Sequence, residues 1–367
     1  MKVTHITTAH SRFDTRIFLK ECRSLSSVGY DVSLIVADGK GYEENENVEI
    51  YDVGLFKGRL NRIFRATKHA LNKALELNSD VYHLHDPELL PIVRGLKKAG
   101  KQVIFDAHED VPKQLKKKSY LNPLTRTLLS RVFGAYEKVV FKIVDFVVAA
   151  TPAIETKFRR LGNVCYCVNN YPIIGELTKD LNSWAAKKNR IAYVGAIGNM
   201  RGIQQVVRAM EIQRSNVNLQ LAGKFASFME EEEARSKLGW ENVTMYGYVG
   251  REQVKEILSQ SVAGLVTFLP APNHVDAQPN KMFEYMSAGI PVIGSNFDLW
   301  KEVIEENNCG ICVDPNSPEA IATAIDYLVV HPEVAEKMGR NGKKAVYEKY
   351  NWDIEKQKLF ELYRSLR

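Results

Sequence analysis

Short apolar runs alternate with longer amphipathic stretches along this sequence, and that alternation limits the chain to parallel sheets covered by helices. In the first half, strands are expected at 3–7, 32–36, 48–53, 81–85, 103–106 and 146–150. The alternation stops in a polar, turn-rich loop and begins again, with strands expected at 190–194, 219–222, 243–246, 263–268, 291–294 and 310–313. Because the chain has 367 residues, each half can bury a core of its own.

We therefore predict an α/β protein built from two Rossmann-like parallel-sheet domains. The first is expected to span residues 1–170, followed by a linker at 171–189 and a second domain at 190–349. We expect the last helix, at 350–367, to pack back on the first domain. Ligands in open parallel sheets bind at the carboxyl ends of the strands, so the two domains are predicted to face a central cleft.

Composition narrows the class of protein further. No apolar run reaches the roughly 18 residues of a membrane-spanning helix, and the polar start is unlike a signal peptide. The five cysteines are too few and too irregularly spaced for a disulfide framework. Cys309 and Cys312 form an isolated C-x-x-C pair, so reduced structural thiols are expected rather than a zinc site. These features predict a cytoplasmic protein.

The net charge of +6 is concentrated in the first half of the chain. Residues 1–185 hold 28 basic and 21 acidic side chains, a net charge of +7. No acidic residue occurs between 55 and 75, and the basic residues between 113 and 142 are met only by Glu137. Such a one-sided field indicates an anionic partner, either lipid headgroups or nucleic acid. No nucleic-acid-binding module is recognised, so we expect no nucleic-acid partner.

Apolar residues occur at helical spacing within both basic stretches. This pattern suits docking of the two helices on an anionic lipid surface. Ordinary helices that face the core with their apolar side and expose a solvated basic side would give the same pattern, and the sequence leaves both interpretations open.

The first candidate site lies where two neighbouring strands of the first half end. His83, His85 and Asp86 close one strand, and His108 and Asp110 follow the next. These side chains could bind a metal, orient a substrate, or cap the helices that follow; both aspartates stand where helix N-caps would. His83 and His85 share one face of a strand, but His-x-His spacing alone is a weak signal, and we assign no metal ligands. We expect His108 to contact substrate.

The second candidate site is the loop that leads from the strand at 190–194 into a helix. Gly195, Gly198 and Gly202 allow the backbone to approach a phosphate, and Arg201 can form a fork of hydrogen bonds with it. The dinucleotide fingerprint G-x-G-x-x-G and a Walker lysine are both absent, so a plain turn between strand and helix fits this segment as well.

The third candidate site is the segment at 273–295. A helix is predicted to begin at Asn280 and Lys281, and its free N–H groups and dipole favour an anion there. Glu284, one turn into the helix, can accept two hydrogen bonds from a ribose diol. Asp276 in the preceding loop can meet a sugar hydroxyl.

Taken together, these segments and the opening Phe13-Asp14-Thr15-Arg16 resemble a family 4 glycosyltransferase of the GT-B fold, the retaining group that builds bacterial surface polysaccharides. The resemblance covers essentially the whole chain. It implies an enzyme of class EC 2.4 that moves a hexosyl or N-acetylhexosaminyl group from a nucleotide sugar, with uridine favoured as the base. The acceptor that it implies is a lipid-linked glycan, as in O-antigen or capsule synthesis at the inner face of the cell membrane.

The resemblance also assigns roles to residues. It implies that His108 contacts the donor sugar near the reacting carbon, that Arg201 neutralises the donor diphosphate, and that Glu284 holds the ribose. It also places Tyr248 and Val249 beside the base, Asp276 at the sugar, and Asn280 and Lys281 at the phosphates. Gly195 is a further candidate for donor binding. Asp14, Arg16 and His85 are candidates for the acceptor or phosphate side.

Three positions depart from the pattern of the family. Ala196 stands where an arginine is frequent, and we consider Arg16 or Lys281 as its replacement. Asp276 stands where the first glutamate of the E-x7-E motif is expected, and the segment 11–14 replaces an amino-terminal Gly-Gly loop.

The chain lacks the Asp-x-Asp motif of metal-dependent transferases, so we expect a reaction without metal or cofactor. Positive potential from Arg201 and from the helix that begins at Asn280 would then stabilise the leaving diphosphate. A nucleotide-sugar epimerase or phosphorylase of the same fold is an alternative. A degenerate binding subunit of a transferase complex is another, motivated by Ala196 and Asp276.

Overall fold

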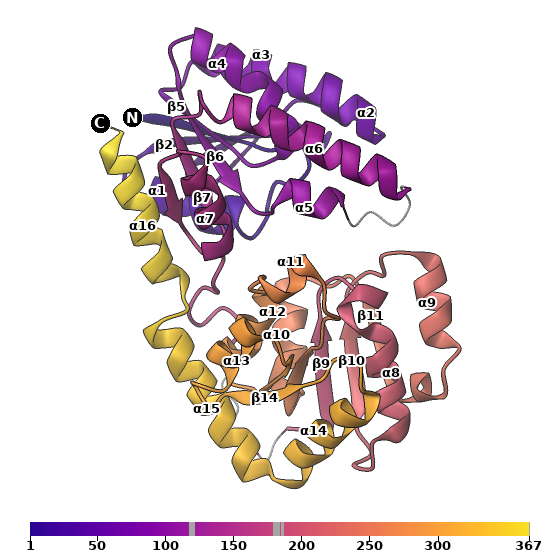
Figure 1. Ribbon diagram of the computed structural model, residues 1–367. Coiled ribbons are helices and arrows are strands. Elements are labelled where there is room, and N and C mark those ends of the chain that lie inside the picture. Colours follow the sequence, from indigo (N-terminus) through magenta and orange to yellow (C-terminus); the bar gives the residue numbers. More distant parts are fainter. Residues whose placement is uncertain (117–121, 179–183, 185–186, 367) are drawn as a thin grey trace. The chain divides into compact units, whose positions relative to one another are not determined.

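The structure is a computed structural model that describes residues 1–116, 122–178, 184 and 187–366. The chain forms two compact units, each with its own sheet and helices (Figure 1). Unit 1 comprises Met1–Asn170 and Ile354–Arg367, and unit 2 comprises Tyr171–Asp353. The carboxyl-terminal segment therefore belongs with the amino-terminal unit.

Unit 1 contains an eight-stranded sheet in the order β3-β4-β2-β1-β5-β6-β7-β8. All neighbours are parallel except β3 and β4, which pair antiparallel at the edge. The strands are β1 (Lys2–Ile6), β2 (Asp31–Val36), β3 (Glu43–Asn45), β4 (Val48–Asp52), β5 (Val81–Leu84), β6 (Gln102–Ala107), β7 (Phe146–Ala149) and β8 (Cys165–Cys167). The sequence did not predict β3 and β8, because three-residue edge strands are too short to show an alternating pattern.

Helices cover both faces of this sheet (Figure 1). The first helical segment, after β1, begins as a π-helical stretch, η1, and continues as α1. The helical elements of unit 1 are η1 (Ile17–Cys22), α1 (Arg23–Ser27), α2 (Arg59–Asn61), η2 (Arg62–Ala66), α3 (Thr67–Leu77), η3 (Pro87–Ile92), α4 (Val93–Lys98), α5 (Val111–Leu115), α6 (Pro123–Val140), α7 (Pro152–Arg160) and α16 (Trp352–Ser365), of which α16 begins in unit 2.

Unit 2 contains a six-stranded, fully parallel sheet in the order β11-β10-β9-β12-β13-β14. Its strands are β9 (Arg190–Val194), β10 (Asn218–Ala222), β11 (Val243–Gly247), β12 (Ala263–Val266), β13 (Val292–Ser295) and β14 (Gly310–Val313). Its helical elements are η5 (Asn199–Arg201), α8 (Ile203–Ile212), α9 (Phe228–Arg235), η6 (Leu238–Asn242), α10 (Arg251–Gln260), α11 (Pro272–Val275), α12 (Asn280–Ser287), α13 (Asp298–Ile304), α14 (Pro318–Val330) and α15 (Pro332–Glu348).

Close backbone packing fixes the position of α12 on the second sheet. A Cβ atom at Gly264 of β12 would lie 2.4 Å from the ring of Tyr285, so only glycine lets the helix approach this strand. The Tyr285 hydroxyl accepts a hydrogen bond from the backbone N–H of Val194 at 3.0 Å. This hydrogen bond holds α12 against the carboxyl end of β9.

The observed architecture confirms the predicted fold class of two parallel-sheet α/β domains. The carboxyl ends of parallel strands meet at one edge of each sheet, and the candidate residues follow these ends. All five cysteines are unpaired thiols, as expected. Within the described ranges, no helix is both long and apolar enough to cross a membrane.

Candidate active site

In unit 1, polar side chains gather where β1, β5 and β6 end, with the fully buried Asp106 at the centre. Arg16 donates to both of its oxygens, from Nε to Oδ2 at 2.7 Å and from Nη2 to Oδ1 at 2.8 Å. Nε2 of His108 lies 2.9 Å from Oδ2, and Nδ1 of His85 lies 3.2 Å from the same oxygen. His108 is the member of this group that reaches solvent, with 23% of its side chain exposed.

The charge on Asp106 is fixed by these neighbours. Burial alone would raise the pKa of its carboxyl, but Arg16 and His108 more than offset burial, and the pKa lies well below its usual range. A carboxylate that stays charged keeps the proton of His108 on Nε2. Nδ1 is then the acceptor that the His108 ring can offer to a ligand.

His10 lies beside His108, although the sequence analysis did not single it out. The two ring centroids are 5.5 Å apart, and Nδ1 of His10 lies 2.9 Å from Oδ1 of Asp86. Burial lowers the pKa of His10, but Asp86 raises it by more, so the net shift is upward. Its place just after the carboxyl end of β1 is the signal that could have identified it.

Asp86 stands at the N-cap position of η3, as the sequence suggests, but its side chain makes no capping hydrogen bond there. Its Oδ2 accepts hydrogen bonds from the loop after β1, from the backbone N–H of Thr8 at 2.6 Å and from Thr7 Oγ1 at 2.9 Å. The strand β5 carries Asp86 next to this loop because β5 pairs with β1. Asp110, in contrast, accepts from the backbone N–H of Lys113 at 3.3 Å and caps α5 as predicted.

The three residues predicted for the acceptor or phosphate side lie at different depths. Asp14 accepts from the backbone N–H of Arg16 at 2.9 Å and supports the start of η1. Arg16 and His85 are buried beneath His108, and Nη1 of Arg16 also donates to the carbonyl of Val168 at 2.9 Å. Because its donors are engaged in the core, Arg16 is a poor replacement for the arginine missing at Ala196.

In unit 2, two cations meet at the carboxyl end of β9. Gly195 follows this strand with a φ of +100°, and a Cβ atom there would lie 3.7 Å from Cε of Lys281. The guanidinium carbon of Arg201 lies 5.4 Å from the ring centroid of Phe268, and Nζ of Lys281 lies 5.5 Å from the same centroid. The predicted phosphate loop and the start of α12 therefore form one positively charged site.

Lys281 is the more unusual of these cations. It is 6% exposed, and its Nζ lies 3.7 Å from the ring centroid of Tyr193 without a hydrogen-bond partner among the described residues. Burial, and then the charge of Arg201, lower the pKa of Lys281 well below its usual value. A buried ammonium without an acceptor costs several kcal/mol, and a bound anion would relieve that cost.

Glu284, predicted to hold a ribose, is paired with Arg251, which the sequence analysis did not identify. Nη1 of Arg251 donates to Glu284 Oε1 at 2.7 Å, while Nε and Nη2 donate to Glu176 at 2.6 and 2.9 Å. The Glu284 side chain remains 15% exposed. Arg251 therefore orients the carboxylate, and no local pattern in the sequence links two residues on separate helices.

The remaining predicted donor residues lie on loops and helix ends of unit 2. Asp276 directly follows α11, Asn280 begins α12, and both are exposed. Tyr248 is 78% exposed, with Nζ of Lys224 lying 5.4 Å from its ring centroid. Val249 packs against the core of the unit.

Both basic stretches of unit 1 form helices with exposed apolar side chains. In the stretch formed by α2, η2 and α3, Leu60 and Phe64 are each 70% exposed. In α6, Leu124, Leu128 and Val132 are 84%, 63% and 57% exposed. Helices that face the core with their apolar side would bury these residues, so this interpretation does not account for them.

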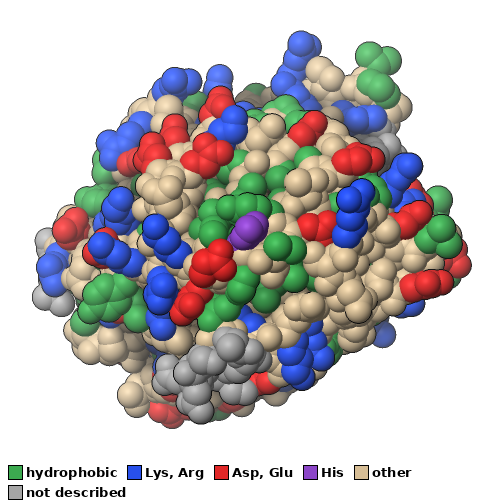
Figure 2. All heavy atoms as spheres, turned by 90° about the horizontal axis from the view of Figure 1, so that it is seen from below, with side chains coloured by type: hydrophobic (Ala, Val, Ile, Leu, Met, Phe, Trp, Pro, Cys, Tyr) green, Lys and Arg blue, Asp and Glu red, His purple; other side chains and the backbone are tan. Residues whose placement is uncertain are grey.

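The surface is not uniformly basic. On the face drawn in Figure 2, basic and acidic side chains lie interspersed around an apolar area. Lys117 and Lys118, which belong to the second basic stretch, lie outside the described residues.

In a comparison with known proteins, the two halves of the chain match two different family models. The model "Glycosyltransferase Family 4" matches residues 15–166, and the model "Glycosyl transferases group 1" matches residues 177–345. The chain belongs to family 4 of the GT-B glycosyltransferases. This confirms the family resemblance at that level.

Sequence identity to individual relatives is low. An uncharacterized glycosyltransferase of Methanocaldococcus jannaschii is 29% identical over 47% of this chain and 44% of its own length. The D-rhamnosyltransferase WbpZ of Pseudomonas aeruginosa is 24% identical over 74% of this chain and 70% of its own. The matched region thus spans less than half of the first of these glycosyltransferases.

Among solved structures, HepE of Anabaena in complex with UDP-glucose has a TM-score of 0.75, with 13% identity and all of both chains covered. At this identity the likeness establishes a shared fold. It agrees with the parallel sheets described above.

Proposed function

We propose that this glycosyltransferase transfers a sugar from a nucleotide-sugar donor to a lipid-linked glycan, with retention of anomeric configuration and without a catalytic metal. The observation that carries the proposal is the buried, unpartnered amino group of Lys281 beside Arg201 at the end of β9, which a bound anion would hold as an ammonium ion. The diphosphate of a nucleotide sugar supplies the oxygen acceptors that this ammonium needs. HepE, which was solved with UDP-glucose, shares the fold, and a uridine nucleotide is the donor that we favour.

In this mechanism, Lys281 and Arg201 stabilise the charge that develops on the leaving diphosphate. Both cations are held against Phe268 before the donor binds, so little reorganisation accompanies the reaction. Lys281 then takes the role of the arginine missing at Ala196. Glu284, oriented by Arg251, accepts hydrogen bonds from the ribose, and Asp276 meets a sugar hydroxyl.

In unit 1, His108 is assigned to the donor sugar near the reacting carbon. Asp106 orients the imidazole through a contact with Nε2, and Arg16 donates hydrogen bonds to Asp106 from the buried side. We assign no protein nucleophile: the donor phosphate helps to deprotonate the acceptor hydroxyl on the same face of the sugar. Asp-x-Asp is absent from the sequence, and the two cations of unit 2 supply the positive charge that a divalent ion would otherwise provide.

The basic helices of unit 1 are assigned to the membrane that presents the acceptor. Exposed leucine, valine and phenylalanine side chains beside lysine and arginine are the combination that inserts at a membrane interface and attracts anionic headgroups. We therefore place the protein at the cytoplasmic face of the membrane, as a peripheral protein.

Turnover of a panel of nucleotide sugars by the purified chain tests the activity. The panel is assayed with and without a crude lipid-linked glycan fraction, and with and without brief EDTA treatment. We expect one donor to release its nucleotide, with sugar incorporated into lipid and no effect of EDTA. Tight nucleotide binding without turnover would indicate a degenerate binding subunit, and release that needs no acceptor would indicate an epimerase or hydrolase. Loss of activity during brief EDTA treatment that leaves the melting temperature unchanged would refute the metal-free reaction.

Sedimentation with vesicles that contain anionic lipid tests the membrane assignment separately. Leu128→Ser combined with Val132→Ser should weaken binding, whereas Val330→Ser on α14, where the side chain is 66% exposed, serves as a matched control. Wild-type protein that does not bind these vesicles would refute the assignment.

A further inference from the structure

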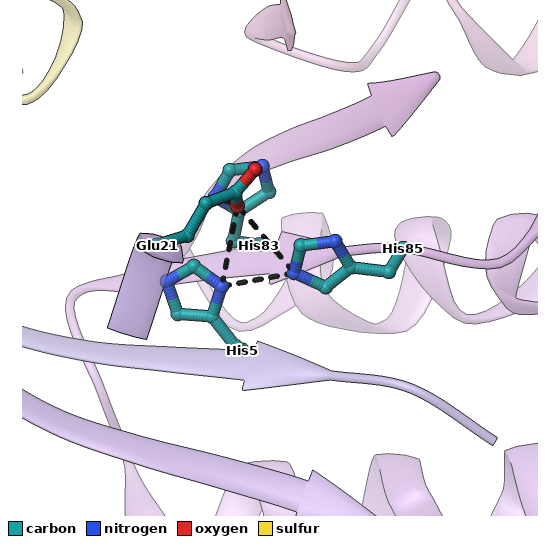
Figure 3. A group of neighbouring side chains, drawn as sticks. All are labelled: His5, Glu21, His83 and His85. Atoms are coloured by element: carbon teal, nitrogen blue, oxygen red, sulfur yellow. Dashed lines mark hydrogen bonds and ion pairs between the residues drawn. The ribbon is translucent and has the colours of Figure 1, made fainter. Parts of the chain in front are cut away.

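Beneath the candidate active site of unit 1, four side chains that can ligate a metal point toward one another (Figure 3). His5 lies on β1, His83 lies on β5, and His85 directly follows β5. Glu21 comes from η1. Pairing of β1 with β5 sets His5 directly opposite His83, and the two-residue spacing returns His85 to the same face. All four residues are buried.

The four ligand atoms all lie within 4.8 Å of one another. Nδ1 of His5 lies 2.9 Å from Nε2 of His85, and Oε2 of Glu21 lies 3.9 Å from His5 Nδ1 and 4.0 Å from His85 Nε2. Nδ1 of His83 lies 3.9 Å from the same carboxylate oxygen. A tetrahedral Zn²⁺ with bonds of about 2.0–2.1 Å separates its ligands by about 3.3–3.4 Å, so the observed distances lie on both sides of the ideal value.

Several polar atoms of this cluster have no hydrogen-bond partner among the described residues. They are both carboxylate oxygens of Glu21 and, on the ring nitrogens that do not face the ion, Nε2 of His5 and Nε2 of His83. Without an ion, Nδ1 of His5 and Nε2 of His85 share a hydrogen bond. Arg16 lies near, with Nε 3.1 Å from Glu21 Oε1, but its Nε–H donates to Asp106 instead. Buried polar groups without partners are rare in folded proteins, and a bound cation would satisfy the carboxylate.

A histidine binds a metal as the neutral imidazole, through a lone pair on one ring nitrogen. His85 has a second-layer partner of the kind found around metal sites, because its Nδ1 lies 3.2 Å from Asp106 Oδ2. His83 contacts the Tyr363 hydroxyl at 2.9 Å through Nδ1, and that hydroxyl must turn its proton away when Nδ1 binds an ion.

We propose that this cluster binds one divalent first-row transition-metal ion, with Zn²⁺ as its best-fitting occupant, through His5, Glu21, His83 and His85. Neutral imidazoles with one carboxylate are a ligand set that suits such ions and disfavours Mg²⁺ and Ca²⁺. The site is structural: it joins β1, β5 and η1 beneath the pair formed by Asp106 and His108. The proposal does not depend on the proposed reaction, which uses no metal.

A metal-free core is the competing explanation. Without an ion, a fully buried carboxyl whose oxygens have no hydrogen-bond partner among the described residues is favoured as the neutral acid. A protonated glutamate has the same shape and polarity as glutamine. Glu21→Gln therefore separates the two explanations: it removes a metal ligand but leaves a metal-free core nearly unchanged.

The metal content of the full chain, purified from cells grown with added zinc and dialysed free of loosely bound ions, is the deciding measurement. We expect one Zn²⁺ per wild-type chain, and at least a tenfold lower content in Glu21→Gln and His83→Gln. His69→Gln, which changes an exposed histidine of the same unit, should keep the ion. Wild-type protein that holds less than about a tenth of an equivalent, or a Glu21→Gln variant that keeps full occupancy, would overturn the proposal.

Refolding gives an independent readout. The chain is unfolded with a chelator and refolded with Zn²⁺, with Co²⁺, or without metal. We expect Co²⁺ to give the absorption bands of a tetrahedral site and Zn²⁺ to raise the melting temperature of the wild type but not of Glu21→Gln. Equal melting temperatures with and without metal, and no cobalt bands, would count against the site.

Discussion

Replacing Lys281 by methionine should make the protein more stable and its nucleotide binding weaker. The ammonium is buried and has no hydrogen-bond partner among the described residues, and its main compensation is the ring of Tyr193 at 3.7 Å. Desolvation of such an ion costs several kcal/mol, and a cation–π contact returns about 2 kcal/mol. Methionine fills the same space without a charge. We therefore expect the free energy of unfolding to rise by about 1–3 kcal/mol.

The same substitution removes a charged side chain that donates hydrogen bonds to the bound diphosphate. A hydrogen bond to a charged group contributes about 1.5–3 kcal/mol, so the Kd for UDP should rise by about 10- to 150-fold. Thermal unfolding without ligand and calorimetric titration with UDP measure the two effects separately. Lys337→Met changes an exposed lysine of the same unit and should alter neither quantity.

Proton linkage supplies a third test. The pKa of Lys281 is lowered in the folded protein, so the unfolded chain binds more protons between that pKa and about 10.4. Wild-type stability should therefore rise with pH across this window, by more than that of Lys281→Met. A variant that is less stable than the wild type, binds UDP equally well and shows the same pH dependence would refute the assignment of Lys281 to the phosphate site.

Three further predictions follow from the same structure. Arg201→Ala should lower kcat by about a hundredfold, equivalent to about 3 kcal/mol of transition-state stabilisation, in initial-rate measurements with saturating donor. His108→Ala should lower turnover at least about tenfold while nucleotide affinity in a titration is kept; unchanged turnover would remove this residue from the site. Burial would raise the pKa of Asp86, but His10 and backbone donors bring it down to about 2. This carboxylate should contribute about 2–3 kcal/mol of stability that is present above pH 4 and is lost as the pH falls toward 2. In acid unfolding curves, Asp86→Asn should lack that part of the pH dependence.

Local patterns in the sequence were sufficient for most of the secondary structure. Alternating apolar residues and turn-forming residues identified twelve of the fourteen strands found in the described part of the chain, because side-chain period and chain breaks are properties of neighbours along the chain. The strands β3 and β8, of three residues each, were missed since no period can be read over so short a run. The loop at Gly195 and the helix that begins at Asn280 were identified for the same local reason.

The partners of the site residues were decided by tertiary structure. Arg251 reaches Glu284 across two helices, and Arg16 reaches Asp106 across 90 residues of chain. No local pattern encodes such pairs, because they depend on how helices pack on a sheet. Packing also decided which of two cations is available. From the sequence, Arg16 and Lys281 were equally good replacements for the missing arginine, and only the packing of unit 1 engages the donors of Arg16 in the core.

The cluster of His5, Glu21, His83 and His85 shows most directly what the sequence determines and what the tertiary structure determines. The sequence by itself determined that His83 and His85 share a face of a strand, and this was too weak a signal to assign a metal site. The parallel register of β1 and β5 brought His5 opposite His83, and the turn into η1 brought Glu21 to the same point. Side-chain type is a property of the sequence, whereas convergence of ligands from three elements is a property of the fold.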